Sequence, residues 1–213
     1  MEIGVEQLTV VIDGRTILNR VSLACRPGTV TALVGPSGAG KTTLLNVMGL
    51  LLRPTAGRVR VGGTDATGWG SRQRRRFWRD HAAFILQDYG VIEEESVAFN
   101  VTMRASLLRG RVAGDPERLR AVLAATGLEG REREPAVRLS GGEKRRLGVA
   151  RALYKDARVI FADEPTASLD ERNRARVIEL LVSLARQGRT VVVATHDEAM
   201  ARAADSLYAL QRA

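Results

Sequence analysis

The sequence predicts an α/β fold: a mostly parallel sheet with flanking helices, an antiparallel N-terminal β subdomain and an inserted helical lobe. Three observations predict it. Short apolar runs alternate with segments of helical periodicity along most of the chain. One run, Val159 to Ala162, is wholly apolar, as suits a parallel strand covered on both faces. The opening segment instead alternates apolar and polar residues around Asp13-Gly14, which is typical of an antiparallel hairpin.

The first part of the chain is interpreted as a hairpin, a strand, a glycine-rich loop and a helix. Alternation from Ile3 to Ile12 and from Ile17 to Leu23 predicts the two hairpin strands. A third strand, Thr29 to Val34, leads into the loop, and Lys41 to Leu51 has helical spacing. The order of strand, loop and helix is the one that phosphate binding requires.

The middle of the chain is mostly helical, with predicted helices over 72–79, 97–108 and 116–125 and one strand over 82–86. We expect an inserted helical lobe at about 88–156. The last part alternates helices over 142–154, 171–186 and 197–203 with strands over 159–162, 190–194 and 206–210. No internal repeat or long linker divides the sequence, so residues 1–213 are expected to form a single domain.

Composition indicates a chain that folds around its own apolar core. Of its residues, 45% are apolar, and the single cysteine, Cys25, cannot form an intramolecular disulfide. Cys25 is expected to be a buried apolar side chain rather than a reactive thiol. We find neither a basic-then-apolar leader nor an apolar run near the roughly 20 residues of a membrane span. The expected location is cytoplasmic, and any membrane role must come through a partner.

A net charge of +9 and a pI near 10.8 raise the question of nucleic-acid binding. The arginines are scattered, however, aromatic residues make up 4% of the chain, and no stacking platform interleaves with a basic stripe. No nucleic-acid partner is therefore expected. The densest cluster, Arg72 to Arg79, is expected to form a solvated helix face, with contact to a partner or an anionic membrane surface as the alternative.

The strongest chemical signal is the glycine-rich loop between the third strand and the first helix. It comprises Gly35, Pro36, Ser37, Gly38, Ala39, Gly40, Lys41 and Thr42. Glycines let the backbone turn its N–H groups toward phosphate oxygens, and the helix adds its positive end. Lys41 can bridge the outer phosphates, Thr42 can ligate Mg²⁺ and Thr43 can donate to an inner phosphate. The loop predicts a P-loop NTPase core that binds a nucleotide with magnesium.

Two adjacent acids follow the apolar strand. Asp163 is placed to hold the magnesium ion through water, and Glu164 can polarise an attacking water. We expect different roles because successive strand residues face opposite ways. His196 follows another core strand, where it can donate a hydrogen bond to the outer phosphate and orient the water with Glu164. Gln87 follows the strand over 82–86 and can present its amide oxygen to magnesium.

A second glycine pair, in Leu139-Ser140-Gly141-Gly142-Glu143, opens a predicted helix. In isolation such a segment is a common N-cap. Here it follows a phosphate loop and precedes an acid-tipped strand, so it offers a second anion-binding surface. One copy of the chain cannot easily wrap both surfaces around one triphosphate, whereas two copies facing head to tail can.

Together these motifs resemble the nucleotide-binding domain of ATP-binding cassette (ABC) transporters over nearly the whole chain. The resemblance implies an ATPase that dimerises around two MgATP, with a second copy of itself or a related ABC ATPase. The residues implied to contact nucleotide across the dimer are Ser140, Gly141 and Gly142, which bind the outer phosphate, and Asp170, which monitors the partner's site. The resemblance makes Glu164 the catalytic base, His196 the switch histidine and Gln87 the lobe-joining glutamine. Ile12 stands where the family usually stacks an aromatic on adenine.

The segment from Gln87 to Val97 is similar to exporters of the lipoprotein-release, macrolide-export and bacteriocin-export group. In these proteins the surface receives a short helix of the membrane subunit, so a permease contact is implied near Gln87 to Val101. The three acids Glu93, Glu94 and Glu95 predict that the partner helix is basic. The implied location is peripheral, on the inner face of the cell membrane through that subunit.

Three other functions compete with a transporter ATPase. A soluble cassette ATPase acting on nucleic acid or ribosomes usually has two cassettes in one chain or a long coiled-coil insertion, and this sequence has neither. A non-catalytic nucleotide-binding scaffold conflicts with the presence of Lys41, Asp163, Glu164 and His196. A non-transporting regulator of a membrane or cell-envelope complex remains open, because the sequence does not separate transport from regulation.

Overall fold

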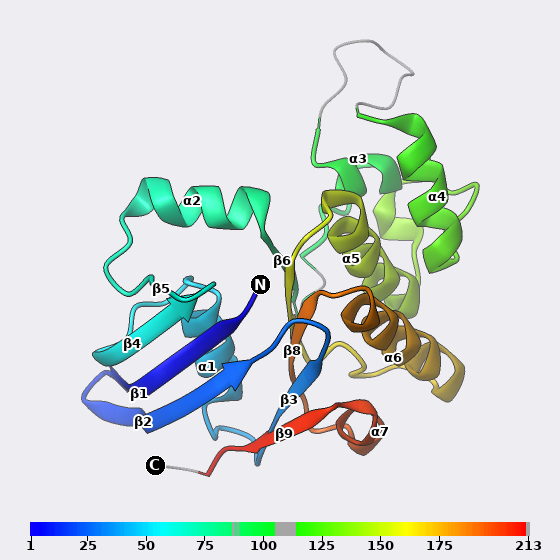
Figure 1. Ribbon diagram of the computed structural model, residues 1–213. Helices are drawn as coiled ribbons and strands as arrows, with labels where there is room; N and C mark the ends of the chain where they lie inside the picture. The colour runs from blue at the N-terminus through cyan, green and yellow to red at the C-terminus, as the bar shows by residue number, and fades with distance from the viewer. Residues whose placement is uncertain (87, 89, 105–113, 212–213) are drawn as a thin grey trace.

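The computed structural model describes residues 1–86, 88, 90–104 and 114–211 and contains two sheets (Figure 1). The N-terminal sheet has the strand order β2-β1-β4-β5 and is antiparallel. Its strands are β1 (Ile3–Ile12), β2 (Arg15–Cys25), β4 (Ala56–Val61) and β5 (Thr64–Asp65). The predicted hairpin is confirmed. The pair β4 and β5 was not predicted, although Val59 and Val61 alternate with arginines as a half-buried strand requires.

The second sheet is parallel throughout, with the order β6-β7-β8-β3-β9. Its strands are β3 (Val30–Val34), β6 (Ala82–Ile85), β7 (Val159–Asp163), β8 (Thr190–Ala194) and β9 (Ser206–Ala209). Every residue of β7 and β8 is buried, because helices cover both faces of the sheet. The doubly wound parallel core predicted from the apolar runs is confirmed.

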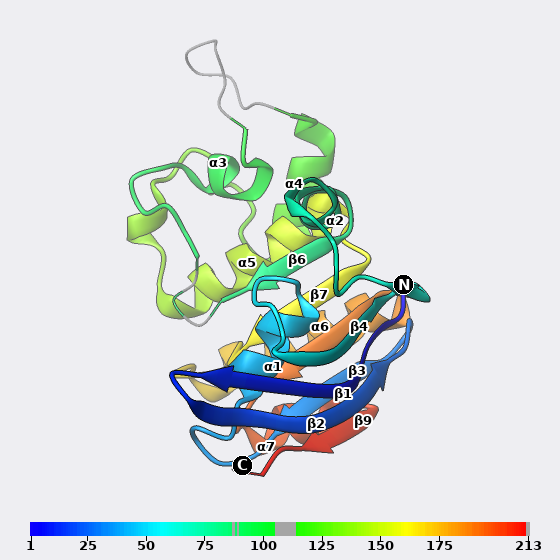
Figure 2. The same cartoon turned by 90° about the vertical axis from the view of Figure 1, so that its left-hand side faces the viewer.

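Helices cover both faces of the parallel sheet. The helix α1 (Lys41–Met48) packs between the two sheets, and its leucines share a core with strands of both (Figure 2). On the other face lie α6 (Glu171–Arg186) and α7 (Glu198–Ala203). The helix α2 (Ser71–Asp80) lies at the edge of the molecule and leads into β6. Thus α1 and the phosphate loop before it are held by the cores of both sheets.

A helical lobe stands beside the parallel sheet (Figures 1 and 2). It contains α3 (Val97–Thr102), α4 (Pro116–Thr126), the 3₁₀ turn η1 (Ala136–Arg138) and α5 (Gly141–Lys155), which share an apolar core. The predicted helix over 97–108 ends after Thr102, where Met103 has a left-handed φ of 51°. Residues 105–108 of that prediction lie outside the described residues. The helix α5 also packs on β6 and therefore joins the lobe to the sheet.

Two further expectations concern Cys25 and membrane spans. Cys25 is fully buried, as predicted, and burial raises the pKa of its thiol to about 11. Across the part of the chain that the structure describes, none of the helices combines the length and apolarity needed to span a bilayer.

Candidate functional site

The phosphate loop leads into α1, and no described side chain caps the first turn of this helix. The first residue of α1 is Lys41, and its N-cap is Gly40 in the left-handed conformation, with φ of 88°. A Cβ atom at Gly40 would lie 2.8 Å from Cδ2 of Leu18, so glycine is required for space as well as for backbone angle. Within the described residues no side chain caps α1, and its first turn contains no acid. The N–H groups of this turn are therefore available to an anion.

Lys41 and Thr42 are the first two residues of α1, and the side chain of each makes hydrogen bonds at the loop. The Lys41 ammonium donates to the carbonyl oxygens of Gly35 at 2.8 Å and Pro36 at 3.1 Å. These bonds hold the cation over the loop, where outer phosphates would lie. The Thr42 hydroxyl donates to Oδ1 of Asp163 at 3.2 Å. Thr42 and Asp163, the two predicted magnesium ligands that lie within the described residues, are thus in contact.

The two acids after the apolar strand differ in backbone conformation. Asp163 is the last residue of β7 and is 6% exposed. Glu164 lies outside the strand, with a left-handed φ of 47°, and its N–H donates to the carbonyl of Ala194. A left-handed backbone at a non-glycine residue is strained and is common at functional sites. This backbone turn, rather than strand alternation, separates the directions of the two carboxylates.

Burial raises the pKa of the Asp163 carboxyl above its ordinary value. The Thr42 hydroxyl partly offsets this by its hydrogen bond, and the neighbouring Glu164 carboxylate raises the pKa further. Asp163 is therefore a buried acid whose negative charge is poorly compensated. A bound cation would supply that compensation.

His196 contacts Glu164 from the end of the neighbouring strand β8. Its Nδ1–H donates to Oε1 of Glu164 at 2.9 Å, and its backbone N–H donates to Oε2 at 3.3 Å. The Glu164 side chain is 12% exposed, whereas the His196 ring is 71% exposed. Because Nδ1 is used, Nε2 can donate to a phosphate oxygen only when the ring carries both protons. These hydrogen bonds place His196 beside Glu164, and the predicted contact of His196 with an outer phosphate stays a prediction.

These residues line one cavity of about 550 Å³, a volume suited to a small-molecule ligand. The described residues that line it are Ile17, Ser37, Gly38, Gly40, Lys41, Thr42, Thr43, Glu164 and His196. Ser140, Gly141 and Gly142 are absent from this lining. Part of the phosphate loop thus shares a cavity with Glu164 and His196, and Asp163 is likewise absent from the described lining.

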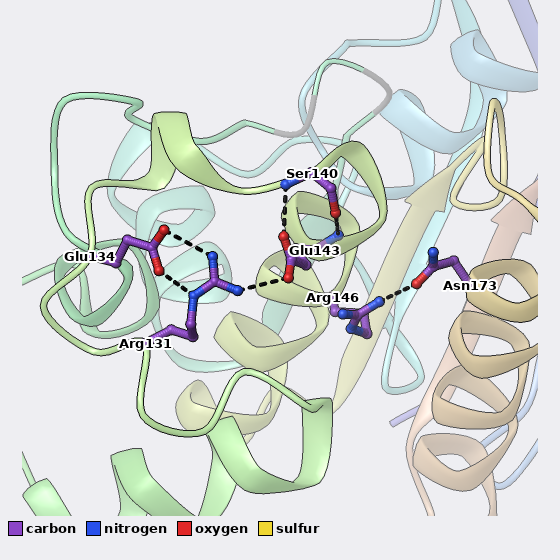
Figure 3. A network of polar contacts seen from close by, with 6 residues as sticks. All are labelled: Arg131, Glu134, Ser140, Glu143, Arg146 and Asn173. Atoms are coloured by element: carbon purple, nitrogen blue, oxygen red, sulfur yellow. Dashed lines mark hydrogen bonds and ion pairs between the residues drawn. The ribbon is translucent and has the colours of Figure 1, made fainter.

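The second surface is the start of α5, where Ser140 is the N-cap. The Ser140 hydroxyl accepts from the backbone N–H of Glu143 at 3.3 Å, and the Glu143 carboxylate accepts from the Ser140 N–H at 2.8 Å. This capping box satisfies donors of the first turn. Figure 3 shows that Arg131 lies between Glu143 and Glu134 and bonds to both. The loop before α5 is therefore fixed in shape by a chain of ion pairs.

A second set of contacts joins this helix start to α6. Asp170 caps α6 by accepting from the backbone N–H of Asn173 at 2.9 Å and from its side-chain amide at 2.6 Å. The side-chain oxygen Oδ1 of Asn173 accepts in turn from Arg146 of α5 (Figure 3). A Cβ atom at Gly142 would lie 2.8 Å from Cγ of Asn173, so the glycine permits this approach. Predicted residues Gly142 and Asp170 are thus linked through Asn173.

The remaining predicted site residues lie apart from the cavity or outside the described chain. Ile12 ends β1, is 40% exposed and is absent from the described cavity lining, whereas Ile17 of β2 is part of that lining. Gln87 lies outside the described residues. Ile17 was not predicted, because an apolar strand residue carries no sequence signal for ligand contact.

Arg145 is a second residue that the sequence analysis did not select. It belongs to α5 and is 3% exposed, and its guanidinium donates to the carbonyl of Leu86 at 2.5 Å. Leu86 directly precedes Gln87. Arg145 also acts on Asp163, whose pKa its positive charge lowers. Arginine is seldom buried, so an arginine among the apolar positions of the predicted helix was the available signal.

The residues present fit a nucleotide with magnesium. The open N–H groups of α1 and the Lys41 ammonium suit phosphates, and the Thr42–Asp163 pair supplies the hard oxygen donors that Mg²⁺ prefers. No group of three or more His, Cys, Asp or Glu side chains able to hold a metal occurs among the described residues.

Comparison with known sequences places the chain among nucleotide-binding cassettes. A family model described as ABC transporter matches residues 18–167. The chain is 41% identical over 189 residues to the macrolide export ATP-binding/permease protein MacB of Chromobacterium violaceum, which covers 89% of this chain and 29% of that relative. It is 39% identical over 205 residues to the lipoprotein-releasing system ATP-binding protein LolD 1 of Rhodospirillum rubrum, which covers 93% of this chain and 90% of that relative. The chain thus spans less than a third of the MacB relative and most of LolD 1.

Comparison with solved structures agrees. The chain superposes on a dimeric bacterial ABC transporter cassette with a TM-score of 0.86 and 29% identity, covering 98% of this chain and 94% of that one. The match to a dimeric post-hydrolysis cassette bound to ADP and Pi has a TM-score of 0.85, with 29% identity and the same coverage. The predicted family is confirmed: the chain belongs to the ABC transporter family.

Proposed function

We propose that this chain is the ATP-hydrolysing subunit of an ABC transporter, dimerising head to tail around two MgATP and driving a separate membrane subunit of an exporter. The carrying observation is the composition of the cavity. It combines the phosphate loop with Glu164 and His196, while Ser140, Gly141 and Gly142 are absent from its described lining. Two dimeric cassettes match the fold, which supports a second copy of the chain as the source of the residues that complete the site.

Each residue then has a defined task in hydrolysis. The loop N–H groups and Lys41 bind the phosphates, and Thr42 with Asp163 holds Mg²⁺, which supplies charge neutralisation when bound. The Glu164 carboxylate accepts the proton of the attacking water. His196 fixes the direction of that carboxylate through its two hydrogen bonds. The second copy contributes Ser140, Gly141 and Gly142 to the outer phosphate and brings Asp170 to the interface.

The test is steady-state ATP hydrolysis at several protein concentrations, with Glu164→Gln examined beside wild type. Hydrolysis should rise more than linearly with protein, because two copies form each site. Glu164→Gln should lower turnover about a hundredfold or more while ATP binding persists, because the amide cannot accept the proton. Size-exclusion chromatography with MgATP should then show a trapped dimer.

Glu198→Gln is the matched control, since this acid lies on exposed α7 and pairs only with Arg202 among the described residues. It should hydrolyse ATP at the wild-type rate. Retained turnover in Glu164→Gln would remove Glu164 from the role of base. Linear dependence on protein, with no ATP-dependent dimer in the variant, would contradict the shared site.

The segment before α3 is proposed to receive the membrane subunit. Buried Asn100 fixes its shape, since the side-chain amide donates to the Ile92 carbonyl and its oxygen accepts from the Ile92 N–H, each at 2.9 Å. Glu93 pairs with Lys144 of α5, so part of the acidic charge is used within the chain. Glu94 and Glu95 are exposed. These two acids support contact with a basic helix of the partner.

Glu94→Lys/Glu95→Lys should abolish co-purification of the chain with its membrane subunit, because two attractive charges become repulsive. The matched control is Glu129→Lys/Glu171→Lys, which changes two exposed acids elsewhere. Equal loss in the control would indicate a dependence on overall charge. Co-purification of both variants would contradict this contact. The proposed location, peripheral on the cytoplasmic face of the membrane, depends on the same contact.

A further inference from the structure

The helix α2 presents a basic stripe that the proposed ATPase cycle does not use. Arg72, Arg75, Arg76 and Arg79 follow the spacing i, i+3, i+4, i+7, so they share one helix face, and all four are exposed. Together with Trp78 they line a hollow of about 710 Å³. The described ion pairs of the stripe run only to Asp80, from Arg79 at 2.6 Å and Arg76 at 3.8 Å. The stripe therefore carries a clear excess of positive charge.

The buried side of α2 anchors the helix to the core, and half-buried Trp78 takes part in this anchoring although it also borders the stripe. Phe77 is 2% exposed and packs edge-on against Trp69, with ring centroids 6.3 Å apart. Buried Arg74 donates to the Leu50 carbonyl at 3.2 Å, and Trp78 Nε1 donates to the Gly49 carbonyl at 2.8 Å. Gly49 and Leu50 directly follow α1. The basic stripe is thus held on a fixed support behind the phosphate-binding helix.

The position of α2 favours a membrane surface. Figures 1 and 2 both place α2 at the same end of the molecule as α3, and α7 with β9 at the opposite end. The proposed permease contact lies directly before α3, so this end would face the membrane. The negative potential of an anionic bilayer surface attracts arginines, and tryptophan suits the interface.

We propose that the stripe Arg72, Arg75, Arg76 and Arg79 binds the headgroups of anionic phospholipids. Guanidinium groups match phosphate oxygens in charge and geometry. A row of arginines with a single tryptophan suits a bilayer surface better than nucleic acid, which needs groove readout or several stacking aromatics. The orientation toward the bilayer rests on the proposed function, whereas the lipid binding itself does not need hydrolysis.

Vesicle co-sedimentation of the purified chain tests the proposal. The probes are vesicles of phosphatidylcholine alone and vesicles in which about a third of the lipid is phosphatidylglycerol. Wild type should bind only the anionic vesicles, and added salt should weaken binding. Arg72→Gln/Arg75→Gln/Arg76→Gln should weaken binding about a hundredfold, as three surface charges are lost.

The matched control is Arg20→Gln/Arg172→Gln/Arg186→Gln, which removes three exposed arginines elsewhere and likewise lowers the net charge from +9 to +6. It should bind anionic vesicles almost as wild type does, and thermal melts should show both variants folded. Equal weakening of both variants would overturn the proposal in favour of net charge alone. Absence of vesicle binding, or stripe-dependent binding of duplex DNA or RNA in its place, would also overturn it. ATP hydrolysis by the same samples reports separately on the proposed function.

Discussion

The helices α1 and α5 both begin at glycine-rich segments, yet their first turns are satisfied in opposite ways. At α1 the N-cap is Gly40, and neither a side-chain cap nor an acid occupies the first turn within the described chain. At α5 the N-cap is Ser140, and Glu143 closes a capping box that Arg131 supports. The first helix start is open to a ligand, whereas the second is already occupied by its own side chains.

This difference indicates how two phosphate-binding surfaces can have unequal strength. An anion at α1 meets free N–H groups and the Lys41 ammonium. An anion at α5 meets a helix start that carries the negative charge of Glu143, which opposes its binding. If both surfaces bind phosphate as proposed, the α1 end is expected to bind it more tightly than the α5 end.

The largest expected effect comes from Lys41→Ala, which removes the cation from the open helix start. Nucleotide affinity should fall about a hundredfold, because charge-assisted hydrogen bonds to phosphate are lost, and hydrolysis should fall with it. A fluorescent-nucleotide titration measures the affinity. Arg58→Ala, which removes an exposed cation of β4, should bind nucleotide normally. Unchanged affinity in Lys41→Ala would show that the loop N–H groups suffice.

Ser140→Asp should separate the two surfaces. Aspartate is as good an N-cap as serine, so α5 should persist, but its charge would repel the partner's phosphate. We expect hydrolysis to fall about a hundredfold and the nucleotide affinity of the single copy to stay constant. The control is Ser96→Asp, the same change at the N-cap of α3. A loss of nucleotide affinity in Ser140→Asp would contradict the division of labour.

Glu143→Gln should have the opposite effect to Ser140→Asp, because it removes a negative charge from the start of α5. The glutamine oxygen can still accept from the Ser140 N–H, while the negative charge at the helix start disappears. ATP-dependent dimerisation should strengthen about two- to fivefold, as expected for a charge in the first turn. Analytical ultracentrifugation measures the dimerisation of Glu143→Gln, made in the Glu164→Gln background. Glu129→Gln in the same background is the control. Weaker dimerisation would show that the link to Arg131 matters more than the charge.

The smallest effect should come from Asp163→Asn, measured as the Tm of the nucleotide-free protein. Burial raises the pKa of Asp163 in the folded state, so ionisation of this group opposes folding above that pKa. Asparagine should raise Tm at neutral pH, and the gain should vanish as the pH falls below the ordinary aspartate pKa of about 3.9. Glu198→Gln should leave Tm unchanged at both pH values. A lower Tm in Asp163→Asn at neutral pH would contradict the account.

Local patterns were sufficient to predict most of the fold. Short apolar runs predicted the parallel strands. The confirmed hairpin had both alternation and a turn at Asp13-Gly14. The pair β4 and β5 was missed because only Val59 and Val61 alternate as apolar residues in β4, and β5 has only two residues. The end of α3 after Thr102 was missed because a left-handed residue such as Met103 has no signature in sequence.

By itself the sequence determined which chemical groups are present: the glycine loop with Lys41 and Thr42, the acids Asp163 and Glu164, and the family to which they point. These motifs are contiguous, so their spacing alone defines them. Only the tertiary structure decided which groups meet. Chain folding brings His196 to Glu164 and seats Ile17 in the cavity, although neither neighbour is adjacent in sequence. Contacts between residues far apart in the chain depend on the packing of whole elements, and no local pattern encodes that packing.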